Sequence, residues 1–296
     1  MGIIPFDLLF TVKQYPSVGI KIDAESFLMQ GGGPVPNVVV GMSRLGLTSA
    51  LIAPVGNDPF GDVLIEELKK EKVHTKYIIR KNKPTALASG WIEKAGSRTM
   101  VLSREICINP RDIKLTSLPI SKILHLDGRD MPATMKLAKW ARKNNVIVSF
   151  DIGSVRNDVS AVFPYVDHLV VADEFAFPFT KTKNIQKAIK RLSTYCNGTI
   201  VITEGIKGST GKEFGSDEFI HQKAYKVKNV DTTGAGDCYH SGYLFALLQN
   251  KPLSERMRFG SAAAALKCQK AGARSGIPRK KELLSFLKTK KSFYNV

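Results

Sequence analysis

Residues Val230 to Leu244, VDTTGAGDCYHSGYL, indicate the end of a strand, a glycine-containing turn and the start of a helix. Gly234, Ala235 and Gly236 carry almost no side chain, so their backbone N–H groups can approach an anion closely. A helix that begins at this turn adds the positive end of its dipole. The stretch therefore predicts an anion site at a helix N-terminus.

Asp237 falls in the first turn of the same predicted helix. A carboxylate beside an anion site repels the anion, which indicates a functional reason for its presence. The simplest reason is a general base that takes a proton from a hydroxyl nucleophile. The alternative interpretation is an ordinary helix N-terminus that is capped by Asp231, Thr232 or Thr233.

The full run, Asp-Thr-Thr-Gly-Ala-Gly-Asp and, three residues later, Ser-Gly-Tyr-Leu, resembles the C-terminal signature of the ribokinase (PfkB) carbohydrate kinases. This resemblance implies an ATP-dependent sugar kinase with a ribokinase-like α/β fold. Such a fold has a central, mostly parallel sheet flanked by helices and a small β-sheet lid. The resemblance also implies that Asp237 is the general base, that Gly234, Ala235 and Gly236 form the anion hole, and that Mg²⁺ bridges the phosphates of ATP.

Length and composition are those of an ordinary globular protein, with 296 residues, 43% apolar residues and 24% charged residues. We expect one ribokinase-like domain over residues 1–296, because α/β folds of this length are often single. No stretch approaches the roughly 20 apolar residues that span a bilayer, and the N-terminus lacks the basic region of a signal peptide. The four scattered cysteines favour reduced thiols in a cytoplasmic protein.

The formal net charge of +18 is large, and such a charge is typical of proteins that bind nucleic acids, anionic membranes or anionic substrates. The lysines are, however, spread along the chain, and the aromatic residues do not alternate with them as a base-stacking surface requires. We therefore favour a basic, solvated surface over a nucleic-acid site.

The first forty residues carry the expected sugar-binding residues. Asp7 interrupts an apolar run, where a carboxylate is costly without partners, and the glycines before a helical pattern indicate close backbone approach to a ligand. The run GGGPVPN at 31–37 resembles the family's N-terminal signature, which implies substrate contacts from Asp7, Gly32, Gly33 and Asn37. Pro34 stands where ribokinases carry a lysine. The chain also starts several residues later than the family's first strand, so we expect Met1 to lie inside that strand.

From residue 121 onward, apolar strand patterns alternate with helical patterns. Strands are predicted around 123–126, 146–150, 168–171 and 199–203, with helices at 132–144, 158–164 and 183–195. This alternation predicts βαβ crossovers and a mostly parallel sheet.

Asp127 ends the first of these strands, at the edge where α/β folds place their sites. It matches an acidic sugar ligand of the family. The HLDGRD run that contains it and the RFG…KC run at 258–268 resemble the ketohexokinase-like branch of the family.

Two segments, about 8–30 and 84–104, predict strands that lie outside the alternating pattern and form a small separate sheet. In the family this sheet is a lid over the sugar and often a dimer contact, so the resemblance implies a homodimer through the lid. Arg98 projects from the second segment. It is either a solvated strand residue or a charge over the substrate.

The T-x-G-x-x-G run at 203–208 follows a predicted buried strand. In the family this segment passes beneath the nucleotide, which implies ATP contacts from Thr203, Gly205 and Gly208, joined by Gly236. The family's Asn-x-x-Glu motif, which orders magnesium-bound water, is absent here, because Ala172 and Phe175 stand at its ends.

The turn at 272–276 lies near the glycine-containing run in the family. The family implies a K⁺ site there, which would involve Asp231, Thr233 and Ser275.

The sequence thus predicts phosphorylation of a hydroxyl of a small ketose- or pentose-like sugar. Three alternatives stay open: a phosphosugar kinase, a nucleoside kinase, and a nucleotide- or sugar-binding regulator that has lost catalysis. Ala172 and Phe175 motivate the last of these, while the intact Gly-Ala-Gly-Asp run argues against it.

Overall fold

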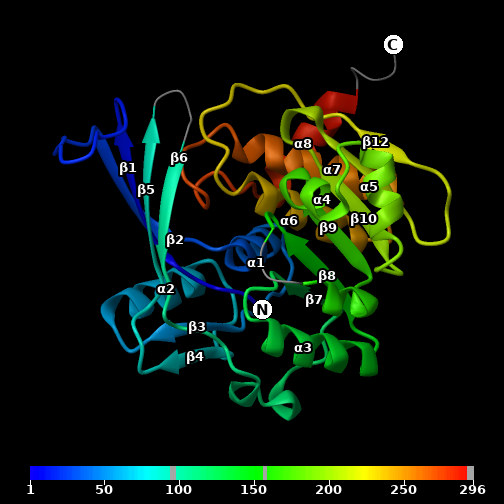
Figure 1. Ribbon diagram of the computed structural model, residues 1–296, viewed down its shortest axis with the longest axis horizontal. Helices are drawn as coiled ribbons and strands as arrows, with labels where there is room; N and C mark the ends of the chain where they lie inside the picture. Colours follow the sequence, from blue (N-terminus) through cyan, green and yellow to red (C-terminus); the bar gives the residue numbers. More distant parts are fainter. Residues whose placement is uncertain (94–97, 156–158, 292–296) are drawn as a thin grey trace.

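The computed structural model describes residues 1–93, 98–155 and 159–291. In this part of the chain the strands form a six-stranded sheet, a four-stranded sheet and a two-stranded sheet (Figure 1). The strands are β1 (Phe6–Val12), β2 (Ser26–Gly31), β3 (Ala53–Gly56), β4 (Ile78–Lys81), β5 (Leu87–Glu93), β6 (Arg98–Ser103), β7 (Ile123–Leu126), β8 (Ile147–Ile152), β9 (His168–Ala172), β10 (Thr199–Thr203), β11 (Ser209–Lys212) and β12 (Ile220–Gln222).

Eight α-helices and four short 3₁₀ helices lie between and around these strands in the described ranges. They are α1 (Pro34–Arg44), α2 (Pro59–Lys70), α3 (Met131–Lys143), α4 (Asp173–Thr180), α5 (Ile185–Leu192), α6 (Ala235–Leu247), α7 (Leu253–Lys267), α8 (Lys280–Lys291), η1 (Pro110–Asp112), η2 (Leu115–Ser117), η3 (Ser160–Tyr165) and η4 (Gly205–Lys207). No described helix has both the length and the apolar character that a membrane span requires.

The six-stranded sheet has the order β12-β11-β10-β9-β8-β7. Strands β7 to β10 are parallel, whereas β11 and β12 are antiparallel additions at one edge. The predicted mostly parallel sheet is therefore confirmed, and its strands fall where the alternating pattern placed them. Near-continuous apolar runs such as 168–172 suit strands that are covered on both faces.

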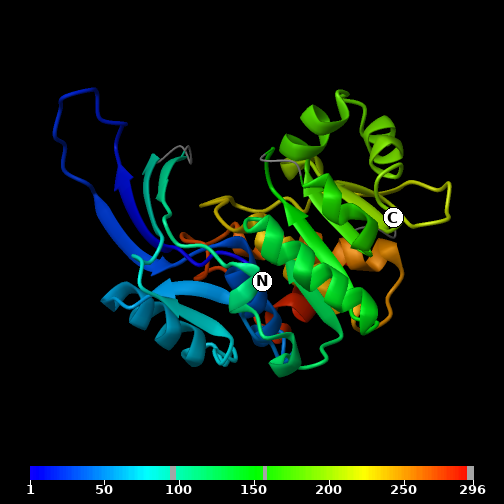
Figure 2. The same ribbon diagram turned by 60° about the horizontal axis from the view of Figure 1, so that its bottom comes forward.

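Helices cover both faces of this sheet (Figure 2). Leu169 and Val171 pack with α3, α4 and α5, whereas Val170 packs with α1, α6 and α7. Alternate residues of one strand thus enter two separate cores, as the period of two in a strand requires. Helix α6, which carries Asp237, consequently lies buried against the sheet and in contact with α1 and α7.

The close packing of α6 on α7 depends on a glycine. A side chain at Gly242 would place its Cβ 2.4 Å from the carbonyl oxygen of Phe259, so only glycine fits there. Ser241 donates from its Oγ to the carbonyl oxygen of Asp237 at 3.0 Å. These contacts fix the first turn of α6, and with it the position of Asp237.

The four-stranded sheet has the order β2-β1-β5-β6 and stands apart from the central sheet (Figure 1). β1 runs antiparallel to β2 and parallel to β5, and β5 runs antiparallel to β6. Its strands lie within the two segments, 8–30 and 84–104, that predicted a separate sheet, apart from the first residues of β1 and the last of β2. The fold-class prediction of a small additional sheet is confirmed.

Three local expectations differ from the structure. The helix expected at 158–164 is the 3₁₀ helix η3, which contains Pro164, and residues 156–158 lie outside the described ranges. Ile20 and Ile22 lie in an exposed loop, because β2 begins only at Ser26. Met1 does not lie inside the first strand, since residues 1–5 form a buried, irregular segment before β1.

Candidate active site

The N-termini of two helices meet at the centre of the candidate site. α1 begins at Pro34 and α6 begins at Ala235. The side-chain amide of Asn37, from the first turn of α1, donates to Oδ2 of Asp237 at 2.7 Å. A predicted sugar-binding residue therefore contacts the predicted general base directly, across 200 residues of sequence.

The turn before α6 has the conformation that its glycines allow. Gly234 has a φ of 78°, and a Cβ at this position would lie 3.1 Å from the Cβ of Ala273. Gly236 is exposed, and a Cβ there would meet nothing within 4 Å. The Ala235 N–H donates to the carbonyl oxygen of Thr232 at 3.0 Å, so this N–H stabilises the turn itself.

Asp7 and the glycine loop after β2 approach each other as closely as glycine permits. A Cβ at Gly32 would lie 2.3 Å from both carboxylate oxygens of Asp7. Gly33 has a φ of 93°, and a Cβ there would lie 2.4 Å from the carbonyl oxygen of Ile3. The structure thus brings Asp7, Gly32 and Gly33 together, at the start of the helix that carries Asn37.

Arg274 connects these groups, and sequence reasoning did not identify it. Its Nε donates to Oδ1 of Asn37 at 3.2 Å, and its Nη1 donates to Oε2 of Glu67 at 2.7 Å. Its Nη2 lies 3.5 Å from the carbonyl oxygen of Gly32. The guanidinium is buried, and this burial lowers its pKa while Glu67 and Asp7 oppose the shift. The sequence signal that could have identified Arg274 is an arginine in a short turn whose other residues are mostly small.

Asp127 approaches from the C-terminal end of β7. Its carboxylate accepts hydrogen bonds from the backbone N–H groups of Ile3 at 3.1 Å and Arg129 at 3.0 Å. Burial raises the pKa of this carboxyl, although the hydrogen bond from Arg129 and the nearby Met1 amine oppose the shift. A Cβ at Gly2 would lie 2.4 Å from Oδ2 of Asp127, so the first residues of the chain shape this position.

The predicted nucleotide-binding residues form a tight turn after β10. Glu204 donates from its N–H to the carbonyl oxygen of Gly208 at 2.8 Å. Gly208 has a φ of 103°, and a Cβ there would lie 2.0 Å from the carbonyl oxygen of Gln222. Gly205 has a φ of 53° and open space around it. Thr203 donates from Oγ1 to Val171 at 3.4 Å, which ties the turn to the neighbouring strand.

A lysine ammonium contacts Asp231, one of the three residues implied in the K⁺ site. Lys267 is fully buried, and its Nζ donates to the carbonyl oxygen of Asp231 at 2.6 Å. The Asp231 carboxylate accepts from the Thr233 N–H at 2.8 Å and from the Thr233 hydroxyl at 2.7 Å. Burial raises the pKa of Asp231, but these hydrogen bonds and Lys267 lower it below its ordinary value overall. Ser275 donates to Ala271 in the adjacent turn.

The segment that replaces the magnesium motif contributes no cluster of ligands. Ala172 precedes α4, Phe175 is buried in the core, and Glu174 is exposed to solvent. Among the residues that the structure describes, no group of three or more histidine, cysteine or acidic side chains is placed to hold a metal ion. The residues present therefore do not fit a magnesium site made by protein side chains alone.

Arg98 begins β6, opposite Ile92 of β5. Its side chain lies outside what the structure describes, so its predicted position over the substrate stays a prediction.

Comparisons with known proteins agree with this geometry. The family model described as "pfkB family carbohydrate kinase" matches residues 1–280. Ribokinase from Haemophilus influenzae is 27% identical over 303 residues, which cover 97% of each chain. A 5-dehydro-2-deoxygluconokinase from Clostridium botulinum is 25% identical and covers 92% of this chain and 88% of its own length. The solved structure of ribokinase from Thermotoga maritima has a TM-score of 0.85, 27% identity and 97% coverage of both chains.

These comparisons confirm the predicted ribokinase-like fold and correct one expectation. The relatives carry the names ribokinase and 5-dehydro-2-deoxygluconokinase rather than ketohexokinase. The predicted proximity to the ketohexokinase-like branch therefore has no support from them. The HLDGRD run that motivated this expectation contains Asp127.

Proposed function

Because the chain belongs to the pfkB family of carbohydrate kinases and is an ATP-dependent sugar kinase, we propose that it phosphorylates a hydroxyl of a small, uncharged, ketose- or pentose-like sugar. The observation that carries this proposal is the hydrogen bond between Asn37 and Asp237. It joins Asn37, in the first turn of α1 after the glycines at 31–33, to the carboxylate of Asp237 in the first turn of α6. One hydroxyl group can therefore reach both the sugar-binding residues and the base.

In this mechanism Asp237 takes the proton of the sugar hydroxyl as its oxygen attacks the γ-phosphorus of ATP. The new O–P bond forms while the bond from the γ-phosphorus to the bridging oxygen breaks and ADP leaves. Asn37 holds the Asp237 carboxylate in one orientation. The N–H groups of Gly234 and Gly236 stabilise charge on the transferred phosphoryl group, while the Ala235 N–H maintains the turn.

An uncharged sugar suits the charges around the proposed sugar site. Asp7 and Asp127 are both buried acidic residues, and their carboxylates accept hydrogen bonds from sugar hydroxyls. A phosphate placed beside two carboxylates would be repelled, unless Arg98 or another cation compensated. Arg274 already interacts with Glu67 and Asn37. These observations favour a free sugar over a phosphosugar, the charged alternative.

The second substrate is ATP with Mg²⁺, and we propose that its phosphates and water supply most of the magnesium ligands. This follows from the replacement of the family's Asn-x-x-Glu motif by Ala172 and Phe175. Thr203, Gly205 and Gly208 provide the surface for the nucleotide, and Gly236 contacts its phosphate. What supports this proposal is the open space around Gly205 and the exposed position of Gly236.

The four-stranded sheet is proposed to close over the sugar as a lid within a single domain, because exclusion of water prevents hydrolysis of ATP. Apolar side chains are exposed on both of its outer strands, including Phe27 and Met29 on β2 and Val101 on β6. These side chains favour a homodimer through the lid. Light scattering on wild type and Phe27→Lys tests this contact: a dimer that the substitution dissociates supports it, and a monomeric wild type contradicts it.

We propose that Lys267 supplies part of the positive charge that K⁺ provides in the family. Its ammonium contacts the carbonyl oxygen of Asp231, one of the three residues implied in the K⁺ site. Turnover is then expected to change less than about twofold when K⁺ is exchanged for a bulky organic cation at constant ionic strength. Strong dependence of the wild type on K⁺ would contradict this role and support a separate K⁺ site near Ser275.

The decisive experiment is an ADP-release assay with ATP and Mg²⁺ across ketoses, pentoses, other aldoses, polyols, phosphosugars and nucleosides. We expect turnover on one class of uncharged sugar. Preference for a phosphosugar or a nucleoside would replace the proposal by one of those alternatives. ATP binding without turnover on any class would favour a regulator that has lost catalysis, the reading that Ala172 and Phe175 motivate.

A further inference from the structure

One side-chain amide beside the proposed sugar site has a buried donor without a partner. Gln30 lies near the end of β2, and only 7% of its surface is exposed. Among the residues that the structure describes, none accepts a hydrogen bond from its Nε2. Buried side-chain donors normally have a partner, because a donor that loses water without gaining an acceptor is destabilising. The sequence gave no reason to single out this glutamine.

Gln30 projects from the same face of the four-stranded sheet as Asp7. The two residues are directly opposite each other in the antiparallel pair of β1 and β2. Opposite residues in such a pair have Cβ atoms roughly 5 Å apart on one face of the sheet. The partner of Asp7 on its other side, in β5, is Ala88, whose small side chain leaves room on this face. One oxygen atom of a ligand can therefore contact both the amide and the carboxylate.

This face is directed toward the turn that follows α7. A Cβ at Gly272 would lie 3.0 Å from Oε1 of Gln30. The Gly272 N–H donates to Oδ2 of Asp231 at 2.7 Å, and Asp231 precedes the turn that begins α6. The Gln30 amide thus lies between the β1–β2 pair and a segment that contacts the start of the Asp237 helix. It belongs to the region in which we place the sugar.

The backbone beside Gln30 is held in place. The Gly31 N–H donates to Oε2 of Glu67 at 2.8 Å, and the same oxygen accepts from Nη1 of Arg274 at 2.7 Å. A Cβ at Gly31 would lie 2.2 Å from that Nη1, so the guanidinium is packed directly against the strand end. The strand cannot shift to give the amide another partner without breaking these contacts. A donor fixed in this way suits a ligand that supplies the acceptor.

We propose that Gln30 determines specificity in the sugar site: its Nε2 donates to the oxygen of one sugar hydroxyl, and the same hydroxyl donates to the carboxylate of Asp7. This inference rests on the proposed function. A carboxylate only accepts hydrogen bonds, so Asp7 by itself does not distinguish a hydroxyl from an ammonium group. The pair of residues requires a group that both donates and accepts, which a hydroxyl does and an ammonium or an ether oxygen does not.

The test uses Gln30→Met, which keeps the length of the side chain and removes the donor. Wild type and variant are assayed with the sugar that the wild type phosphorylates and with analogues in which each other hydroxyl is replaced by hydrogen in turn. The variant should raise the KM for the parent sugar about tenfold, with kcat changed by less than about twofold. For one analogue the wild type should already show this loss, and the variant should add less than about twofold to it.

An unchanged KM for the parent sugar would overturn the proposal, and so would an equal further loss by the variant on every analogue. The Tm of the unliganded protein separates a structural role from this one. Because the donor has no partner there, Gln30→Met should leave Tm unchanged or raise it. A clear fall in Tm would assign the amide to the fold and contradict the proposal. The control is Gln249→Met, which changes an exposed glutamine just after α6 and should leave KM unchanged.

Calorimetric titration of the same sugars in the absence of ATP distinguishes failure of this inference from failure of the proposed function. Sugar binding that Gln30→Met weakens about tenfold, without turnover by the wild type, would refute the kinase reaction and support the role of Gln30. Turnover with equal sugar affinity in both proteins would support the kinase and refute that role. A wild type that binds no sugar would overturn both.

Discussion

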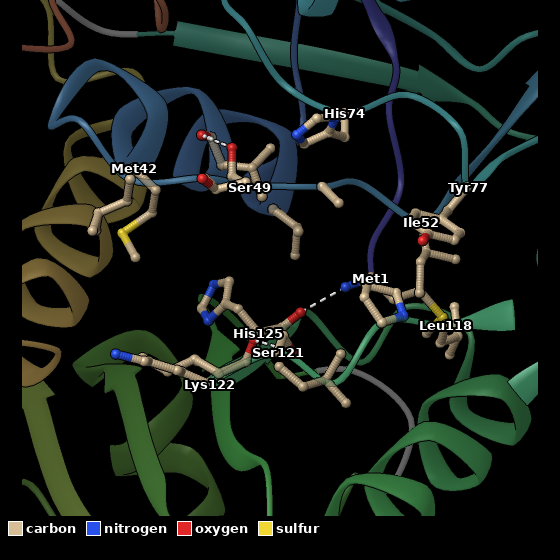
Figure 3. A pocket seen from close by; sticks show the side chains of 18 of the residues that line it. Met1, Met42, Ser49, Ile52, His74, Tyr77, Leu118, Ser121, Lys122 and His125 are labelled. Carbon is tan, nitrogen blue, oxygen red and sulfur yellow. Dashed lines mark hydrogen bonds between the residues drawn. The ribbon is translucent and has the colours of Figure 1, made fainter. Parts of the chain in front are cut away.

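The two sides of the central sheet differ in how completely their strands are paired. β8, β9 and β10 have neighbours on both edges, and Val148, Val170 and Val201 within them are fully buried. β7 has one neighbouring strand, and its other edge borders a cavity at one end of which the Met1 nitrogen donates to the carbonyl oxygen of His125 (Figure 3). The fully paired strands support the helix layer that contains α6 and Asp237, whereas the open edge supports Asp127. The two proposed roles, general base for Asp237 and sugar ligand for Asp127, thus fall in parts of the fold that we expect to differ in local stability.

This difference predicts how variants should behave. Changes to the Asp237 side chain should alter the chemical step with little effect on stability. Changes near Met1 should alter stability and the KM for the sugar, because Ile3 and Gly2 shape the position of Asp127. The predictions below test this separation.

Arg274 connects Asn37 of α1 with Glu67 of α2, and its loss should have the largest effect on stability. Arg274→Met leaves Glu67 without its buried cation and Asn37 without one hydrogen bond. We expect a loss of about 3 kcal/mol of unfolding free energy, measured by urea titration. The KM for the sugar should also rise, since Asn37 loses a contact that orients it.

The control is Lys69→Met, which removes an ion pair between exposed side chains with Glu66. It should cost less than about 0.5 kcal/mol. A similar small cost for both variants would mean that Arg274 does not connect the sugar-binding segments.

The Met1 amine should make stability depend on pH. In the folded chain its pKa is about 5, against 8.0 as the ordinary value, so the unfolded chain binds more protons between these values. Stability therefore rises with pH across this window. Between pH 6.5 and 8 the rise should be about 1.5 kcal/mol in denaturant unfolding.

Two groups near Met1 also make stability depend on pH. His125 has a pKa well below 6.5, which gives a rise that ends near pH 6.5, whereas the raised pKa of Asp127 gives a fall above its ordinary value of 3.8. The matched control is an N-acetylated chain, which has no amine to titrate. An equal slope from pH 6.5 to 8 in both forms would contradict this assignment.

The turn before α6 should show the smallest effect. Gly234→Ala places a side chain at a φ of 78° and close to Ala273, which should cost about 1 to 2 kcal/mol of unfolding free energy. Gly236→Ala meets open space within the helix and should leave Tm unchanged or slightly higher. Equal losses of Tm in Gly234→Ala and Gly236→Ala would mean that the positive φ of Gly234 does not set the cost of its substitution.

Much of the architecture could be predicted from the sequence because its signals are local. Apolar runs such as 168–171 and 199–203 end in polar residues and predicted parallel strands correctly. The run that contains Asp237 predicted a turn and a helix start, and the structure has both. The contact of Asn37 with Asp237 was not predicted, because 200 residues separate the two and the resemblance implied only their separate roles.

The interactions that were not predicted are those between charged residues that lie far apart in the sequence. Nothing local indicates that Arg274 reaches Glu67, or that Lys267 is fully buried against Asp231. Lysine is rarely buried completely, and nothing in the sequence distinguishes Lys267 from an exposed lysine. The cavity beside β7 also has no local signal, since each of its walls is an ordinary strand edge.

The proposed role of Asp237 as general base is tested by single-turnover phosphoryl transfer with Asp237→Asn on the sugar that the wild type uses. The rate should be at least roughly 10²-fold lower than that of the wild type. Tm and ATP affinity should be unchanged, because the Asn37 amide can still donate to the substituted side chain. Transfer at a rate near that of the wild type would contradict the account.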